Sequence, residues 1–231
     1  MKFSKDTIAV LKNFTSIYSG IMLKPGNTIL TRSVTGASYG EAEINDTIDF
    51  EAAIYDLNGF LSILGLVTDQ AEVSLAEDAS NIIIKDQRST IHWPAADPST
   101  IVFPAKKIPF PVAKVIFDLK GSDLQQLLRV AGGLSLDTFA ITNKDGKIVI
   151  HGYNQLEDKE LARPLYSLVC GDYEGDAAFK FIINKLNMKM IPADYRVMLW
   201  AKDDKFATKF EGTQARYVIA MEQGSSHEFQ D

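Results

Sequence analysis

The stretch PAADPSTIVFPAKKIPFP, residues 94–111, decides how the chain is organised. It holds five of the eight prolines in the sequence, at positions 94, 98, 104, 109 and 111. Proline fixes φ and has no backbone N–H, so such a density cannot lie inside a helix or a central strand. We interpret residues 94–110 as a stiff connector between a first domain, residues 1–93, and a second domain, residues 111–231.

The connector also carries apolar side chains that a solvated linker would avoid: Ile101, Val102, Phe103, Ile108 and Phe110. Part of it is therefore expected to pack against a domain.

The two halves of the chain show the same order of hydrophobic patterns. In the first half an amphipathic helix at 4–14 precedes strands at 21–23, 28–33, 38–44 and 48–55, then a helix at 56–67 and strands at 71–76, 81–85 and 88–93. In the second half a strand at 112–119 precedes a helix at 122–131, strands at 138–142, 147–153, 165–169 and 178–183, a short helix at 184–190, and strands at 195–201, 206–210 and 215–221. These patterns predict an α+β fold made by duplication of a whole domain.

Composition excludes several classes of protein. The net charge is −6 with 46% hydrophobic residues, which is typical of folded domains, and no apolar run approaches the 18 residues of a membrane span. The N-terminus lacks the pattern of a secretion signal. One cysteine and three separated histidines predict neither a disulfide nor a zinc site. We expect a cytoplasmic protein without metal, cofactor or membrane attachment.

Charge is distributed unevenly along the chain. Residues 1–39 contain five basic residues and one acidic residue, whereas residues 40–100 contain two basic and twelve acidic residues, and residues 101–231 contain 17 of each sign. A net acidic balance usually argues against nucleic-acid binding, but this polarity leaves room for local basic faces.

The polar faces of the predicted helices carry few acids. Lys5 and Lys12 share one line of the first helix, Arg129 lies on the polar side of the third, and Lys185 and Lys189 are spaced i, i+4 in the fourth. The third helix is expected to begin with a capping box formed by Ser122 and Gln125. Either these helices jointly face a polyanion, contacting phosphates without reading bases, or they are ordinary solvated faces.

Catalytic patterns are weak. Phosphate-cradling, nucleophile-elbow and zinc-protease strings are missing from the sequence, and the acidic runs at 157–160 and 203–204 read as solvated loops. Cys170 is most simply a residue at a strand end, and His92 beside Trp93 is more typical of packing than of catalysis. We therefore expect a protein that is not an enzyme.

Several longer strings carry a resemblance. They are SKDTIAVLKNF (4–14), IYDLNGFL (54–61), RSTIHWPAADPS (88–99), IPFPVA (108–113), DLQQLLRV (123–130) and FIINKLNMKM (181–190). In this order the chain resembles, over essentially its whole length, the DNA polymerase sliding clamps of T-even-type bacteriophages. The resemblance implies the DNA clamp fold, with two similar domains per chain, each with two helices on curved antiparallel sheet. It also implies that three chains close into a homotrimeric ring around duplex DNA.

The resemblance also implies roles for individual residues. The DNA-facing set would be Lys5, Lys12, Lys120, Arg129, Lys185 and Lys189. Protomers would meet through two edge strands, represented by Ile91 and Trp93 in the first domain and by Leu165 and Tyr166 in the second. Short C-terminal peptides of partners would enter a pocket walled by Val102, Phe103 and Ile108; the alternative is that these residues simply cement the two domains together. The tail GSSHEFQD, residues 224–231, is too polar to pack extensively, and we predict that it is flexible.

The function implied is that of a sliding clamp that encircles DNA without sequence preference and tethers the replicative DNA polymerase, which itself supplies the chemistry. A separate ATP-dependent clamp loader would place the ring on DNA in the host cytoplasm, and transcription factors and RNA polymerase join the implied partners. Two alternatives from other classes are a β-rich ring-forming structural virion protein and a β-rich hydrolase using the acidic loops. The lack of a recognisable nucleophile and base in the sequence counts against the hydrolase.

Overall fold

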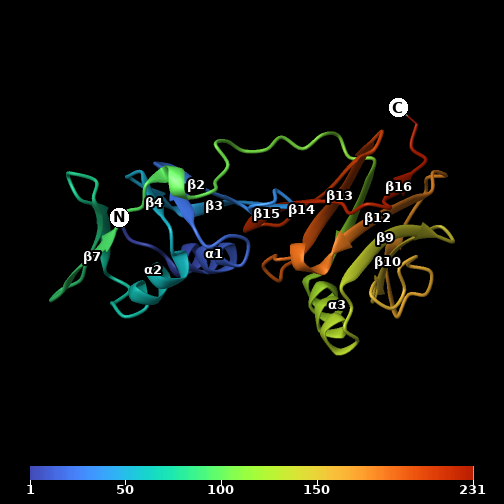
Figure 1. Cartoon of the computed structure of the whole chain (residues 1–231), viewed down its shortest axis with the longest axis horizontal. Coiled ribbons are helices and arrows are strands. Elements are labelled where there is room, and N and C mark those ends of the chain that lie inside the picture. The colour runs from blue at the N-terminus through green and yellow to red at the C-terminus, as the bar shows by residue number, and fades with distance from the viewer. Residues whose placement is uncertain (231) are drawn as a thin grey trace. The chain divides into compact units, whose positions relative to one another are not determined.

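The computed structural model describes residues 1–230 and divides the chain into two compact units, Met1–Ile108 and Pro109–Asp231. The division lies inside the predicted connector, which belongs to the green segment that joins the two units in Figure 1. Most of the connector therefore belongs to the first unit, although the sequence pattern had separated the two.

The first unit follows the order predicted for it: a helix, strands, a second helix and further strands. Its elements are α1 (Lys5–Thr15), β1 (Ile21–Leu23), β2 (Gly26–Arg32), β3 (Ser38–Ile48), β4 (Ala52–Ile54), α2 (Leu57–Leu64), β5 (Glu72–Leu75), β6 (Asn81–Lys85), β7 (Thr90–Pro94) and the 3₁₀ helix η1 (Pro98–Thr100). All strand pairs within it are antiparallel: β1 with β4, β2 with β3, and the three-stranded sheet β5-β6-β7.

Helix α1 begins where its sequence provides caps. The Ser4 hydroxyl accepts a hydrogen bond from the Thr7 N–H at 3.3 Å, and the Ser4 N–H donates to the Asp46 carboxylate at 2.6 Å. Partial burial would raise the pKa of Asp46, but hydrogen bonds from the Ser4 N–H and from the Thr7 and Ser4 side chains outweigh it and hold the pKa below 3.8. Helix α1 buries Val10, Leu11 and Phe14, which leaves its lysines on the solvent side.

The first part of the connector packs on the first unit, as its apolar residues suggested. Asp97 caps η1 by accepting the Ser99 N–H at 2.8 Å. Ile101 is buried in a cluster with Met22 and Ala53, and Phe103 packs against this cluster from outside. Ile108 is 46% exposed, so it is much less covered than Ile101.

The second unit repeats the order of the first after one leading strand. Its elements are β8 (Val115–Leu119), α3 (Gly121–Gly133), β9 (Thr138–Lys144), β10 (Lys147–Tyr153), β11 (Tyr166–Asp172), β12 (Phe179–Asn184), the 3₁₀ helix η2 (Lys185–Asn187), β13 (Tyr195–Lys202), β14 (Lys205–Glu211), β15 (Ala215–Ala220) and β16 (Ser226–His227). One antiparallel sheet has the order β11-β10-β9-β12-β16, and the strands β15, β14, β13 and β8 pair antiparallel in that order. The fold is α+β, with few helices on many antiparallel strands.

The start of α3 differs from the predicted capping box. The N-cap is Lys120, which makes no side-chain cap hydrogen bond, and the Gly121 N–H donates instead to Oδ1 of Asp194 at 2.7 Å. A Cβ at Gly121 would lie 2.9 Å from the backbone of Ala193. Only glycine therefore allows the helix to approach this segment closely enough to be capped by it.

The predicted fourth helix is the largest error in secondary structure. Only the three residues Lys185–Asn187 are helical, and they form a single 3₁₀ turn. Met188 and Met190 are both buried while Lys189 between them is not. That alternation has the period of two typical of extended chain, so the two lysines do not share a helix face.

The C-terminal tail packs more extensively than its polar sequence predicted. Residues of β16 pair with Phe179 and Lys180 of β12, and the Glu228 N–H donates to the Ala178 carbonyl at 2.9 Å. The Phe229 ring stacks on Phe179 with 5.8 Å between centroids, and on His227 at 5.3 Å. The tail thus completes the five-stranded sheet and covers part of its aromatic core.

Candidate nucleic-acid interface

The lysines predicted for α1 lie on its exposed side. Lys5 and Lys12 are both solvent-exposed, and seven residues of helix separate them by roughly 10 Å along the axis. They flank a hollow of about 290 Å³ between α1 and α2, whose floor includes Ile8, Leu61 and Leu64. This face therefore presents two cations around an apolar depression.

In the second unit the predicted cations are less uniform. Arg129 is exposed on α3, and Lys120 is exposed at the N-terminus of that helix. Lys185, in the 3₁₀ turn, and Lys189, in the extended segment after it, are both partly buried. Only Arg129 and Lys120 thus lie at an α-helix in this unit.

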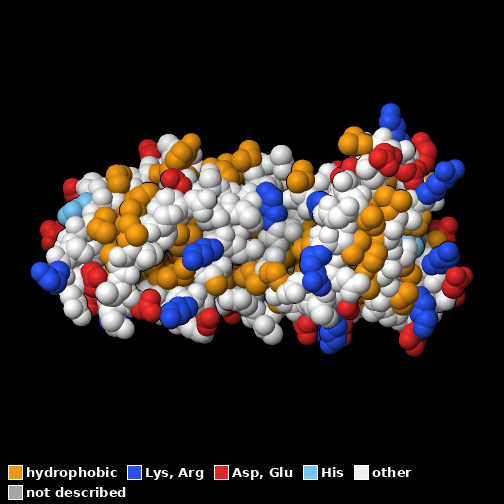
Figure 2. Space-filling view, turned by 90° about the horizontal axis from the view of Figure 1, so that it is seen from below, with side chains coloured by type: hydrophobic (Ala, Val, Ile, Leu, Met, Phe, Trp, Pro, Cys, Tyr) orange, Lys and Arg blue, Asp and Glu red, His pale blue; other side chains and the backbone are white. Residues whose placement is uncertain are grey.

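Carboxylates lie beside these cations, contrary to the acid-poor faces expected from the sequence. Lys5 Nζ is 3.3 Å from a carboxylate oxygen of Asp69, and Lys120 Nζ is 3.9 Å from one of Asp194. Figure 2 shows the same mixing more widely, with basic, acidic and hydrophobic side chains interspersed on the visible face of each unit. Helical periodicity could not reveal these acids because both belong to loops outside the helices.

The first predicted interface strand lies at a sheet edge. β7 is the outer strand of β5-β6-β7, paired only through β6 in that sheet. Ile91 and Trp93 turn toward the unit and are half-buried, and the Trp93 ring packs edge-on against Phe60 with 5.8 Å between centroids. A Cβ at Gly59 would lie 3.0 Å from Trp93, so glycine on α2 makes room for this ring.

The second predicted interface strand is also an edge. β11 is the outer strand of the five-stranded sheet and begins at Tyr166, whereas Leu165 lies just before it and donates its N–H to the Gly152 carbonyl at 2.9 Å. Leu165 and Val169 are exposed by 52% and 60%. Exposed apolar side chains along an unpaired edge are a feature that soluble proteins usually avoid or cover.

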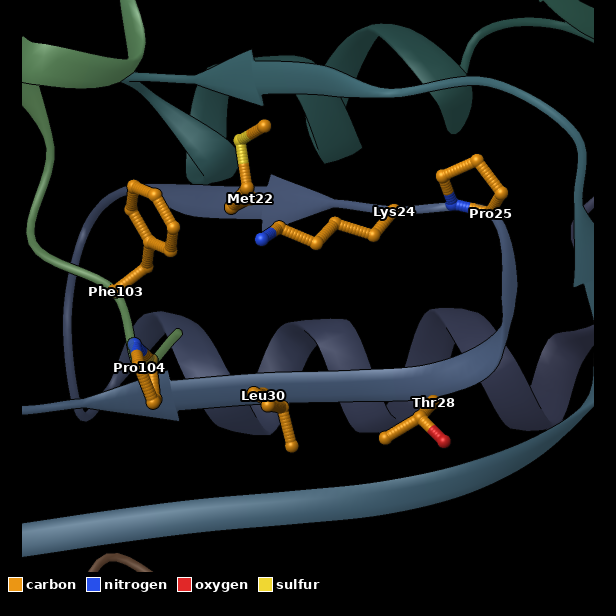
Figure 3. A pocket seen from close by; sticks show the side chains of 7 residues that line it. All are labelled: Met22, Lys24, Pro25, Thr28, Leu30, Phe103 and Pro104. Carbon is orange, nitrogen blue, oxygen red and sulfur yellow. The ribbon is translucent and has the colours of Figure 1, made fainter. Parts of the chain in front are cut away.

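The outer surface of the first unit contains a small apolar cavity of about 130 Å³. Its lining consists of Met22, Lys24, Pro25, Thr28, Leu30, Phe103 and Pro104 (Figure 3). Lys24 Nζ lies 5.2 Å from the centroid of the Phe103 ring, a cation–π distance, and is the one charged group among these residues. The cavity thus combines an apolar wall with a single positive charge.

Phe103 is the one predicted pocket residue that this cavity includes. The Val102 N–H donates to the Tyr18 hydroxyl at 3.3 Å, and the Ile108 N–H donates to the Tyr39 hydroxyl at 3.4 Å. Neither Val102 nor Ile108 lines the cavity. The sequence analysis did not predict that Met22 and Leu30 line this cavity. They belong to β1 and β2, and hydrophobic pattern alone does not show that these strands lie next to the connector.

One serine and one histidine meet in the structure, although the sequence offered no such pair. The Ser167 hydroxyl and His151 Nδ1 are 2.7 Å apart across β10 and β11. Burial lowers the pKa of His151, and the nearby Lys144 and Lys180 lower it further. These cations disfavour the imidazolium that a histidine must form to activate a serine, so the pair is better explained as a cross-strand hydrogen bond.

The Cys170 thiol is also unsuited to act as a nucleophile. Burial, with a contribution from Asp123, raises the pKa of the Cys170 thiol to about 12, which keeps it protonated at neutral pH. Among residues 1–230, no group of three or more histidine, cysteine, aspartate and glutamate side chains could hold a metal ion. In the same residues, no helix has the length and apolar character needed to cross a membrane.

Comparison with known proteins assigns both units. Residues 4–103 match the family described as DNA polymerase processivity factor, and residues 116–223 match the gp45 sliding clamp, C terminal. The chain is 62% identical over 229 residues to the sliding clamp of Escherichia phage RB69, covering 99% of this chain and 100% of that protein. It is 61% identical, with the same coverage, to the sliding clamp of Enterobacteria phage T4.

Solved structures show the same fold at low sequence identity. PCNA from Entamoeba histolytica superposes with a TM-score of 0.67 at 10% identity, covering 93% of this chain and 94% of that one. A. fulgidus PCNA, solved with the C-terminal region of FEN-1, gives 0.64 at 15% identity, covering 95% and 96%.

The family argues against both alternatives, the structural virion protein and the hydrolase, because processivity factors are accessory proteins that bind DNA and the polymerase. High identity over the full length of two curated relatives, two matching sequence families and the clamp fold all agree. The chain belongs to the phage gp45 family of sliding clamps, which are DNA polymerase processivity factors.

Proposed function

We propose that three copies of this chain close into a ring by pairing β7 of one protomer with β11 of the next. The observation that carries the proposal is that, among residues 1–230, β7 forms one edge of β5-β6-β7 in the first unit and β11 one edge of the five-stranded sheet in the second. Two different edges on one chain form a head-to-tail contact, which closes into a ring when the rotation between copies permits. The number three comes from the family resemblance. The residues we assign to the contact are Ile91, Trp93, Leu165 and Tyr166.

Duplex DNA would pass along the helices and contact phosphates without reading bases. We assign this contact first to Lys5, Lys12 and Arg129, which are exposed on α-helices, and then to Lys120, Lys185 and Lys189. Phosphate contacts of this kind fix position but carry no sequence information. Such a surface suits a clamp that must slide past every sequence with the polymerase attached.

Partners would bind the cavity beside Phe103. A. fulgidus PCNA was solved with the C-terminal region of FEN-1 bound to it, so one protein of this fold binds a C-terminal segment of a partner. In this chain the cavity of about 130 Å³ is close in size to the roughly 150 Å³ apolar cavity that holds benzene. We propose that it takes one apolar side chain of a partner peptide, with Phe103 serving both as cavity wall and as cement against the Met22 cluster.

The remaining partners follow from the same family. We propose that a separate ATP-dependent loader opens and closes the ring in the cytoplasm of the infected host. Transcription factors and RNA polymerase would use the same outer surface as the polymerase.

The test combines mass with topology. Light scattering at micromolar concentration should give close to three times the 25.6 kDa of the chain. Rings loaded on nicked circular DNA should stay bound, and cutting the circle should release them through the free ends. A monomeric mass would refute the ring, and equal retention on circular and linear DNA would refute encirclement.

A further inference from the structure

Each unit pairs the lysine at the start of its first helix with an aspartate from a loop. In the first unit Lys5 is the first residue of α1, and Asp69 follows α2 by five residues. In the second unit Lys120 is the N-cap of α3, and Asp194 lies between η2 and β13. Both acids thus come after the second helical element and shortly before the next strand.

Stability does not explain why the pair occurs twice. The four side chains are 67% to 85% exposed, and ion pairs that exposed contribute little to folding. Asp194 also caps α3 by accepting the Gly121 N–H, but α1 is capped by the Ser4 hydroxyl, and the Ser4 N–H donates to Asp46 and not to Asp69. The pairing with a helix-start lysine is therefore the feature that Asp69 and Asp194 have in common.

We propose that Asp69 and Asp194 weaken the grip of the clamp on DNA, so that the closed ring moves along the duplex with little friction. The inference rests on the proposed function, in which α1 and α3 face DNA. A phosphate that binds Lys5 or Lys120 must share the ammonium with a carboxylate already beside it. The acid and the phosphate are then separated by roughly 7 Å, within the screening length of about 8 Å at physiological salt.

The size of the effect follows from Coulomb's law. At that separation in water, repulsion costs each contact roughly a factor of two to three before screening. Further along the helices, Lys12 and Arg129 form no salt bridge within 4 Å in the described part of the chain. A neighbouring carboxylate therefore weakens phosphate binding at Lys5 and Lys120 but not at Lys12 and Arg129.

The test is the double variant Asp69→Asn, Asp194→Asn. Asparagine keeps an acceptor for the Gly121 N–H, so α3 stays capped while the charge is removed. The matched control is Glu43→Gln, Asp203→Asn, which makes the same change in net charge. It also releases a lysine, Lys107, which lies in the connector and pairs with Glu43 at 2.9 Å. Asp203 has a φ of 52°, which asparagine tolerates well.

Two measurements apply to the intact trimer. Binding to a linear 40-base-pair duplex is followed by fluorescence anisotropy between 50 and 200 mM NaCl, and diffusion is followed for single rings threaded over the ends of long linear DNA. We expect the double variant to bind at least about fivefold more tightly than wild type at the lowest salt. The salt dependence should be steeper by roughly one unit of slope, and diffusion about twofold slower or more. The control should remain within about twofold of wild type.

Further variants separate the possible failures. Asp69→Asn should lose its effect when Lys5→Met is already present, because the lysine it releases is then missing. Equality of the double variant with the charge control would overturn the inference. If Lys12→Met also left DNA binding and diffusion unchanged, the proposed DNA-facing surface itself would be wrong. Asp69 does not cap a helix, so the single variant Asp69→Asn can be measured even if the change at Asp194 impairs folding.

Discussion

Replacing His92 with proline should break the ring without unfolding the chain. The Ala95 N–H donates to the Ser80 carbonyl at 3.0 Å, and antiparallel pairing alternates along a strand. Trp93 and Ile91 therefore turn their backbone groups toward β6, while His92 and Thr90 turn theirs outward. His92→Pro removes an outward donor and no hydrogen bond inside the sheet, a position that edge strands tolerate.

The cost can be worked out for one contact and then for the ring. Losing one hydrogen bond and leaving the facing carbonyl of the neighbour unpaired costs about 2 kcal/mol. That weakens one contact roughly 30-fold. Over three equivalent contacts it favours full dissociation into monomers by about 6 kcal/mol, on the order of 10⁴ in the equilibrium constant. Pro94 already lacks a donor, so the Thr90 N–H would be the one outward donor remaining on β7.

The assay is sedimentation or light scattering over a dilution series, with His92→Ala as the matched control. His92→Ala should keep the trimer, because the exposed imidazole is removed but the backbone donor remains. Circular dichroism must show that both variants remain folded. A folded His92→Pro variant that stays trimeric over the same dilution as His92→Ala would refute the assignment of β7 to the contact. Ile91→Glu is a poorer test, because the half-buried Ile91 faces the unit and its loss would perturb folding.

Three further outcomes are expected. Phe103→Ala should weaken binding of a partner C-terminal peptide by about 2 kcal/mol in calorimetry, whereas Val102→Ala, outside the cavity, should not. Phe229→Ala should lower the thermal unfolding midpoint by several degrees, because its stacking over β12 costs about 1–2 kcal/mol to lose. The pKa of Asp46 is lower folded than unfolded, so its contribution to stability is present above pH 4 and is lost as pH falls through the folded value. When the free energy of unfolding is measured over an acid titration, the Asp46→Asn variant should not show this loss.

Sequence patterns were most reliable where one period dominated. The strands at 81–85 and 147–153 have the predicted bounds, and α1 forms where the amphipathic pattern at 4–14 predicted a helix. The prediction of a fourth helix was wrong because it relied on the i, i+4 spacing of the lysines. The alternation of buried Met188 and Met190 with Lys189 is instead typical of extended chain. The capping box at α3 failed because a distant residue, Asp194, supplies the cap that the local sequence also offered.

The candidate site was predictable only where it depended on local sequence. Exposed lysines on α1 follow from helical periodicity, and the two sheet edges follow from the order of strands given by the resemblance. The cavity beside Phe103 needs strands β1 and β2 as well as the connector, so no single stretch of sequence could define it. The packing of the tail was underestimated because its eight residues look polar, whereas Phe179, on which Phe229 stacks, lies 50 residues earlier in the chain.

The charge of this chain favours retention by enclosure over retention by affinity. A net charge of −6 repels DNA at long range, and the cations on the helices are few and partly paired with acids. Such a surface would make a poor conventional DNA-binding protein, because the affinity of those proteins depends on many phosphate contacts. A closed ring needs no such affinity, since it leaves only through an end of the DNA or an opened contact. Weak phosphate contacts then become an advantage, because each one that forms must also break when the polymerase moves by one base pair.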